Sequence, residues 1–149
     1  MIGIDPGQSG GAVLLDGTGE VIDRIAFEKL TDHDIAGMLT IWINQSPAGP
    51  MGNAATIEQV HSMPKQGVAS SFKFGRSFGF LIGVLTTLQI PYTLVTPQKW
   101  QKAMGCLTHG DKNVSKAAAQ RLWPQQKWTH AVADAALIGE YGRRLALRR

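Results

Sequence analysis

An α/β fold is predicted for this chain, with a five-stranded mixed sheet that carries helices on both faces. The main observation is the order of the apolar patterns, which runs three strands, helix, strand, helix, strand and then helices. The length of 149 residues is typical of one domain. The composition, 44% hydrophobic and 17% charged, is that of a folded protein. We therefore expect residues 1–149 to form a single domain.

The first three strands are predicted by short apolar runs separated by turn residues. Residues 1–5 form an apolar run that ends in Asp5, and the glycine-rich segment 6–11 is typical of a tight turn. Residues 12–15 form a second apolar run, and residues 16–19 another turn. Residues 21–27 then alternate between apolar and polar side chains. The chain is thus expected to begin with three antiparallel strands.

A helix and a buried strand are expected next. Thr31 precedes apolar residues that recur at helical spacing from Ile35 to Ile43, so residues 31–34 are suited to cap a helix. Residues 54–60 are short, apolar and β-branched before Glu58, as expected for a central strand. Glu58 would lie near the carboxyl end of that strand.

The second half of the chain alternates between helices and one more strand. A helix is predicted over residues 70–88, in which Gly75, Gly79 and Gly83 leave one face without side chains. Residues 92–95 are predicted to be the fifth strand, and Pro97 begins another helix. Further helices are predicted over residues 113–123 and from about residue 129 to residue 144.

Three acidic residues fall where such a fold can bring them together. Asp5 ends the first strand, Glu58 lies near the end of the fourth, and Asp134 falls in the first turns of the last helix. Carboxylates on separate rigid elements can hold two Mg²⁺ ions roughly 3.5–4 Å apart, as phosphodiester hydrolysis requires. Taken singly, Asp5 is also consistent with a Pro-Gly turn, and the other two with solvated surface positions.

These segments also carry a resemblance to a known family. Residues 3–7 (Gly-Ile-Asp-Pro-Gly), 9–12 (Ser-Gly-Gly-Ala), 57–58 (Ile-Glu) and 130–137 (His-Ala-Val-Ala-Asp-Ala-Ala-Leu) resemble RuvC-type Holliday junction resolvases, particularly the short phage-encoded kind. The resemblance spans nearly the whole chain. It implies a ribonuclease H-like fold, a magnesium-dependent endodeoxyribonuclease, and a homodimer that nicks two strands of a four-way junction symmetrically.

By this resemblance, Asp5, Glu58 and Asp134 are catalytic metal ligands. The family's fourth ligand stands about one helical turn before the last aspartate, where this chain has His130 on the same helix face. A capping or surface role for His130 is the alternative. The implied cofactor is Mg²⁺, with two ions per active site, or Mn²⁺ in its place.

The charge of the chain is compatible with a nucleic acid partner. The formal net charge is +4 and the pI is near 9.5, which favours a polyanion without requiring one. Lys99, Lys102 and Lys112 resemble the family's basic positions near the cleaved phosphate. The predicted DNA phosphate contacts are Lys65, Lys73, Arg76, Lys99, Lys102, Lys112 and Lys116, with a solvated basic surface as the alternative.

Two further features would serve a junction-cutting dimer. The resemblance places a side chain that wedges into the junction centre in the loop after Glu58, where Met63 or His61 would take this role, although Met63 also suits a core position. It also assigns the glycine-lined helix to the dimer interface. Packing of that helix on its own sheet is the alternative.

The lone cysteine and the hydropathy pattern bear on location. Cys106 excludes an intramolecular disulfide framework and a thiolate zinc cluster, and it fits a reducing cytoplasm. No leader-like segment opens the sequence, and the most apolar stretch, residues 78–88, is too short to span a bilayer. We expect a cytoplasmic protein, located in the host cell if it is phage-encoded.

The predicted function is resolution of Holliday junctions and other branched DNA in recombination and repair. A branched-DNA-binding protein without catalysis is one alternative, although it would not need three carboxylates. An ATP-binding domain of the actin or sugar-kinase type is another, because residues 5–10 also resemble its phosphate hairpin. Such domains clamp nucleotide between two lobes, and no second hairpin appears in 149 residues.

Overall fold

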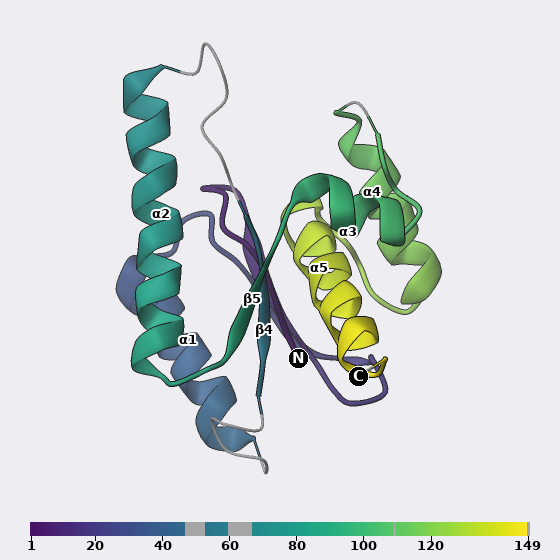
Figure 1. Ribbon diagram of the computed structural model, residues 1–149, viewed down its shortest axis with the longest axis horizontal. Helices are drawn as coiled ribbons and strands as arrows, with labels where there is room; N and C mark the ends of the chain where they lie inside the picture. The colour runs from purple at the N-terminus through teal and green to yellow at the C-terminus, as the bar shows by residue number, and fades with distance from the viewer. Residues whose placement is uncertain (47–52, 60–66, 109, 149) are drawn as a thin grey trace.

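The computed structural model describes residues 1–46, 53–59, 67–108 and 110–148, arranged as Figure 1 shows. Its elements follow the predicted order. The strands are β1 (Ile2–Asp5), β2 (Gly11–Leu15), β3 (Val21–Ala26), β4 (Ala55–Glu58) and β5 (Tyr92–Val95). The helices are α1 (Asp32–Gln45), α2 (Val68–Thr87), α3 (Pro97–Ala103), α4 (Lys112–Leu122) and α5 (His130–Ala146).

The strands form one mixed sheet in the order β3-β2-β1-β4-β5. β1 pairs antiparallel with β2, and β2 pairs antiparallel with β3. β4 pairs parallel with both β1 and β5. The predicted five-stranded mixed sheet is therefore confirmed. The carboxyl ends of two neighbouring parallel strands, β1 and β4, carry Asp5 and Glu58.

Helices cover both faces of the sheet, with α1 and α2 on one side and α3, α4 and α5 on the other (Figure 1). Alternate strand residues serve the two sides, as the two-residue period of a strand requires. Ile2 and Ile4 belong to the core beneath α1 and α2, whereas Val13 and Leu15 belong to the core beneath α5. Each face therefore has its own hydrophobic core.

Small residues allow α5 to approach the sheet closely. A Cβ at Gly3 would overlap the carbonyl oxygen of Ala135 and the backbone nitrogen of Gly139. A Cβ at Gly142 would likewise overlap the hydroxyl of Thr56 on β4. At Gly3 backbone therefore lies against backbone, and at Gly142 the helix backbone lies against a side chain of β4, which are contacts that glycine allows. This contact sets the height of α5 above the ends of β1 and β4.

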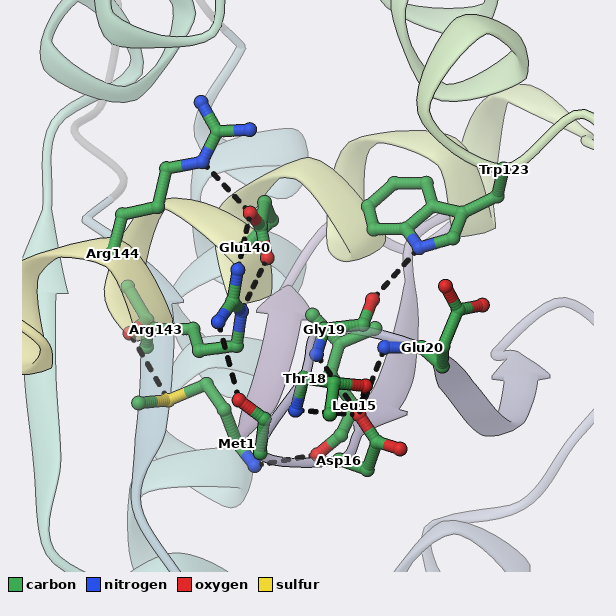
Figure 2. Close-up of polar contacts among 12 residues, drawn as sticks. Met1, Leu15, Asp16, Thr18, Gly19, Glu20, Trp123, Glu140, Arg143 and Arg144 are labelled. Carbon is green, nitrogen blue, oxygen red and sulfur yellow. Dashed lines mark hydrogen bonds and ion pairs between the residues drawn. The ribbon is translucent and has the colours of Figure 1, made fainter.

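A polar network fixes the far end of α5, as Figure 2 shows. Glu140 is 4% exposed and accepts hydrogen bonds from Arg143 at 2.7 and 2.9 Å and from Arg144 at 2.7 Å. Arg143 also donates to the carbonyl oxygen of Gly17, in the turn between β2 and β3, at 3.2 Å. The buried carboxylate is thus paired, as burial requires. These bonds tie α5 to the end of the sheet opposite Asp5.

The ends of several helices match the sequence patterns. Thr31 is the N-cap of α1, and its hydroxyl accepts from the backbone N–H of Asp34 while the Asp34 carboxylate accepts from the N–H of Thr31. Pro97 opens α3 after the N-cap Thr96. The helix predicted from residue 70 begins two residues earlier, at Val68.

The glycine face of α2 points away from the sheet. Cβ atoms at Gly75, Gly79 and Gly83 would meet no described atom within 4 Å, whereas Leu81 and Leu85 pack in the core. The alternative that α2 packs on its own sheet therefore holds for the helix, which makes this contact through the face opposite the glycine stripe. Among the described helices, none is long and apolar enough to cross a membrane.

Candidate active site

Three carboxylates converge at the carboxyl ends of β1 and β4. Asp5 stands two residues after Gly3, and Glu58 stands two residues after Thr56, so both side chains face α5. Asp134 lies near the start of α5. All three line one pocket of about 470 Å³, a volume typical of ligand sites. The structure thus brings together the acidic residues that the sequence predicted to meet.

Asp5 is oriented by the turn that follows it. The backbone N–H of Gly7 donates to Asp5 Oδ1 at 3.0 Å. The turn closes through Gly10, whose N–H donates to the carbonyl oxygen of Gly7 at 2.8 Å. A Cβ at Gly10 would overlap the carbonyl oxygen of Asp5, so only glycine fits this tight turn. Asp5 therefore both stabilises the turn that follows it and lines the pocket.

Glu58 is positioned by β5 and α3. The N–H of Gln59 donates to the carbonyl oxygen of Val95 at 2.7 Å, which joins the ends of β4 and β5. α3 begins two residues after Val95 and carries Trp100 on its second turn. The indole Nε1–H of Trp100 donates to Glu58 Oε1 at 2.7 Å. Glu58 is therefore held from the neighbouring helix as well as by its own strand.

Asp134 lies where α5 packs against α4. Its Oδ1 atom is buried and has no hydrogen-bond partner among the described residues. A buried acceptor without a partner is costly, so a water molecule or an ion is the expected partner of this atom. Burial raises the pKa of the Asp134 carboxyl, and the neighbouring hydroxyl of Ser115 on α4 partly offsets this effect.

Burial raises the pKa of all three carboxyl groups. Desolvation is the largest cause, and it brings the pKa of Asp5 to about 6 and that of Glu58 to about 7. Desolvation also raises the pKa of Asp134. Repulsion adds to the effect, because the charge of Asp134 raises the pKa of both Asp5 and Glu58. Buried groups that repel one another when charged are typical of functional sites and of cation sites.

His130 opens α5, one helical turn before Asp134. It is half-buried, and its Nδ1 atom lies 3.1 Å from the carbonyl oxygen of Lys112. Together with Asp5 and Asp134 it lines a second pocket. With a proton on Nδ1, the ring donates to that carbonyl and keeps Nε2 for another partner. His130 therefore lies beside the carboxylates, on the side that opens to this second pocket.

The donor set of the pocket fits a hard cation. Carboxylate oxygens are the ligands that Mg²⁺ prefers, and the buried Oδ1 of Asp134 has no other described partner. In the described part of the chain, no group of three or more His, Cys, Asp or Glu side chains is close enough, as it stands, to hold a metal ion. Carboxylates that repel one another are expected to stand apart without a cation between them. Asp5, Glu58 and Asp134 are the residues that would hold it.

The predicted phosphate contacts near this pocket lie on α3 and α4. Lys112 is exposed and lines the carboxylate pocket, and its charge lowers the pKa of Asp5, against the larger effect of burial. Lys116, one turn further along α4, is half-buried. Lys99 and Lys102 are exposed on α3 and do not belong to the pocket lining. Lys112 is therefore the lysine best placed to act near the carboxylates.

The other predicted contacts lie on α2 or outside the described residues. Lys73 and Arg76 line a neighbouring pocket with Gly7 and Gln8, and Arg76 also forms an ion pair with Asp32 of α1. Both basic residues are exposed. His61, Met63 and Lys65 lie outside the described residues, so the wedge and one phosphate contact have no position here.

Apart from Lys112, sequence reasoning missed the residues that α3 and α4 contribute to the pocket. Trp100 and Gln101 line it from α3, and the buried Ser115 lines it from α4. Positions 97, 100 and 101 are three and four residues apart and so share one helix face. That spacing is the signal that could have identified the side of α3 nearest Glu58.

A larger pocket, of about 600 Å³, lies at the opposite end of β1. Its two acidic residues are already engaged. Asp16 accepts three backbone N–H bonds at 2.9 Å from the turn that follows it. Asp23 accepts the indole N–H of Trp42 at 2.8 Å. The carboxylate pocket is therefore the stronger candidate.

Cys106 lines the carboxylate pocket, but its thiol is not reactive. The residue is 1% exposed, and burial raises the pKa of its thiol to about 11. The thiol therefore stays protonated at neutral pH and is not a nucleophile.

Comparison with known proteins gives a match in structure rather than in sequence. No protein-family model matches the chain, and no curated protein matches it. The RuvC structure from Thermus thermophilus superposes with a TM-score of 0.61 at 17% identity, covering 98% of this chain and 97% of that one. This chain has the RuvC fold. The ribonuclease H-like fold that the sequence predicted is thus confirmed.

A second match extends the comparison to a DNA complex. The structure of T. thermophilus RuvC in complex with a Holliday junction substrate superposes on this chain with a TM-score of 0.67. Their sequences are 16% identical, over 98% of this chain and 94% of the other. Both structures are of the T. thermophilus protein, and they give no support to a phage origin of this chain.

Proposed function

We propose that this chain is a magnesium-dependent endodeoxyribonuclease that resolves Holliday junctions and other branched DNA. The observation that carries the proposal is the gathering of Asp5, Glu58 and Asp134 in one pocket of a RuvC fold. Support for the substrate comes from T. thermophilus RuvC, which shares the fold and was solved with a Holliday junction. The proposed working unit is one nuclease domain that acts in DNA recombination and repair.

The proposed reaction is an in-line attack by water on a phosphodiester, which leaves a 5′-phosphate and a 3′-hydroxyl. Two bound Mg²⁺ ions would activate the water and stabilise the leaving oxygen, and Mn²⁺ would substitute. Asp5, Glu58 and Asp134 would hold the cations, with Asp5 on β1 as the proposed ligand common to both. His130 is the proposed fourth ligand or orients the attacking water.

Basic residues of the chain bind and orient the DNA in this proposal. Lys112 at the pocket supplies positive charge for the reacting phosphate. The contacts along the rest of the DNA are sequence-independent and therefore salt-sensitive. They are assigned to Lys65, Lys73, Arg76, Lys99, Lys102 and Lys116, and the wedge to His61 or Met63.

The proposed assembly is a homodimer formed through the glycine stripe of α2. The stripe lies open in the described structure, and Phe72 and Val68 on the same helix are 72% and 88% exposed. Exposed apolar side chains beside a bare helix face are typical of an interaction surface. A twofold dimer would present two pockets to the two strands that are cut at a four-way junction.

The test is cleavage of a labelled synthetic four-way junction, with a linear duplex of the same arm sequence as the matched substrate. We expect paired nicks on the junction with Mg²⁺, little cutting of the duplex, and none of either with EDTA. Tight junction binding without cutting, in both Mg²⁺ and Mn²⁺, would contradict the nuclease and favour a non-catalytic branched-DNA-binding protein.

The ATP-binding alternative finds no support in the architecture. The described residues form one five-stranded sheet, and the RuvC fold covers 98% of the chain. Such a domain would need a second lobe to clamp nucleotide. We therefore do not propose ATP binding.

A further inference from the structure

Trp100 makes a hydrogen bond that the proposed reaction does not explain. Its indole Nε1–H donates to Glu58 Oε1 at 2.7 Å. The side chain is 1% exposed and belongs to the core beneath α5, which also contains Val95 and Cys106. Because packing fixes the ring, it also fixes the direction of the N–H. The bond is therefore a rigid feature of the pocket wall.

This bond selects one orientation of the Glu58 carboxylate. The last torsion of a glutamate is broad and roughly two-fold, so a carboxylate without a partner samples many orientations. A hydrogen bond to Oε1 restricts that torsion and leaves the other oxygen for a different partner. The indole nitrogen can only donate a hydrogen bond, so Trp100 has no alternative state in which it accepts one.

Neutral donors hold two of the three pocket carboxylates. The backbone N–H of Gly7 donates to Asp5 at 3.0 Å, just as the indole of Trp100 donates to Glu58. An arginine or lysine in direct contact would largely cancel the negative charge of a carboxylate, whereas a neutral N–H leaves that charge for a cation. Outer partners of this kind orient metal ligands in known metal sites.

We infer that Trp100 is a positioning residue, whose indole N–H orients Glu58 for cation binding. The inference rests on the proposed function, because that proposal makes Glu58 a ligand of Mg²⁺. Loss of the N–H should weaken Mg²⁺ binding about 10-fold, as loss of other outer partners does. The effect should appear in the Mg²⁺ concentration needed for cleavage more than in the rate at saturating Mg²⁺.

The first experiment compares Trp100→Phe with Trp42→Phe. Trp42 is the matched control because it is 3% exposed and donates its indole N–H to a carboxylate, Asp23, at 2.8 Å, away from the pocket. We expect Trp100→Phe to raise the Mg²⁺ concentration for half-maximal junction cleavage about 10-fold. Trp42→Phe should keep the wild-type value. A purely structural role would instead lower activity at every Mg²⁺ concentration.

A second measurement does not depend on cleavage or on the folding of a tryptophan variant. In the ¹H–¹⁵N spectrum of the wild-type protein, the indole signal of Trp100 is identified by its displacement in Glu58→Gln. We expect Mg²⁺ to shift this signal and to leave the indole signal of Trp42 in place. A Trp100 signal that does not respond to saturating Mg²⁺ would overturn the inference.

The two experiments separate failure of this inference from failure of the proposed function. If the wild-type protein cuts junctions and Trp100→Phe has the wild-type Mg²⁺ dependence, the positioning role is wrong and the nuclease stands. If the wild-type protein cuts no DNA but Mg²⁺ shifts the Trp100 signal, the nuclease is wrong and the positioning role stands.

Discussion

Asp5 and Glu58 are buried enough that their charged forms destabilise the folded chain. Burial is the main reason that their pKa values are raised, to about 6 and about 7. A raised pKa of an acid means that the folded state binds the proton more tightly than the unfolded state does. The same burial strengthens the attraction of these carboxylates for a cation. Burial of these carboxylates therefore lowers the stability of the metal-free protein, and binding of a cation would restore it.

We predict that the free energy of unfolding of the metal-free protein falls as pH rises from about 4 to about 7. The unfolded groups titrate near 3.8 and 4.5, and the folded groups near 6 and 7, so stability is full below the lower values and is lost through the higher ones. Thermal unfolding in EDTA across this range is the measurement. Asp5→Asn should flatten the profile, adding on the order of 1–3 kcal/mol near neutral pH. A wild-type profile no steeper than that of Asp5→Asn would contradict the assignment.

For individual residues, the sequence predicted the three acids of the pocket better than the residues that surround them. The acids end strands or begin a helix, which local patterns reveal. The bond from Trp100 to Glu58 joins residues 42 positions apart, so no local pattern encodes it. Lys99 and Lys102 were predicted from their charge and from the family's basic positions, yet the α3 residues that line the pocket are Pro97, Trp100 and Gln101. The charge of a residue is known from the sequence, whereas the face that a short helix turns toward a pocket depends on tertiary packing.

Among the elements, β1 and α5 depend most closely on each other. Gly3 leaves room for the α5 backbone at Ala135 and Gly139. Ala135 directly follows Asp134 in the chain. The ion pairs of Glu140 with Arg143 and Arg144 hold the other end of the helix. The position of Asp134 above Asp5 thus follows from a backbone contact.

We predict that Gly3→Ala destabilises the protein by about 1–3 kcal/mol, because the new methyl group overlaps the α5 backbone. The displaced helix should also reduce cleavage more than the loss of stability explains. Gly37→Ala, on an open face of α1, is the matched control and should stabilise by about 0.5–1 kcal/mol. Denaturant unfolding measures both. Equal stability of the two variants would show that α5 does not need the gap at Gly3.

Element types and order could be predicted because each has a local cause. The capping box of Thr31 and Asp34 and the proline at position 97 mark helix starts without reference to the rest of the fold. The stripe of Gly75, Gly79 and Gly83 shows that α2 has a bare face, but periodicity does not say whether that face meets the sheet. Tertiary packing decides this point, and it turns the stripe outward.

For the molecule as a whole, the RuvC fold was accessible from sequence because three short motifs lie at family-like separations. The strand order, with β4 inserted beside β1, is what places two acidic strand ends next to each other. Assembly and DNA contacts depend on surfaces that face outward. The sequence shows which basic and glycine residues are available on these surfaces, but their roles in DNA binding and dimer formation are proposals.

We predict that the protein is a dimer in solution and that Gly79→Arg makes it monomeric. Position 79 is open in the described structure, so the arginine should not disturb the fold of the chain itself. It would block the close helix approach that the stripe allows. Light scattering after size-exclusion chromatography gives the mass, with Gly37→Arg on α1 as control. A wild-type protein that stays monomeric with and without junction DNA would refute the dimer.

The most direct test of the carboxylate site is junction cleavage by Asp5→Asn, Glu58→Gln and Asp134→Asn, measured beside Glu20→Gln in the exposed turn at the opposite end of the sheet. Each pocket variant should lose at least about 100-fold in the rate of paired nicking with Mg²⁺ while still binding the junction. Glu20→Gln should cut like the wild type. Pocket variants that fold, bind and cut at the wild-type rate would contradict the assignment of this pocket as a metal-dependent nuclease site.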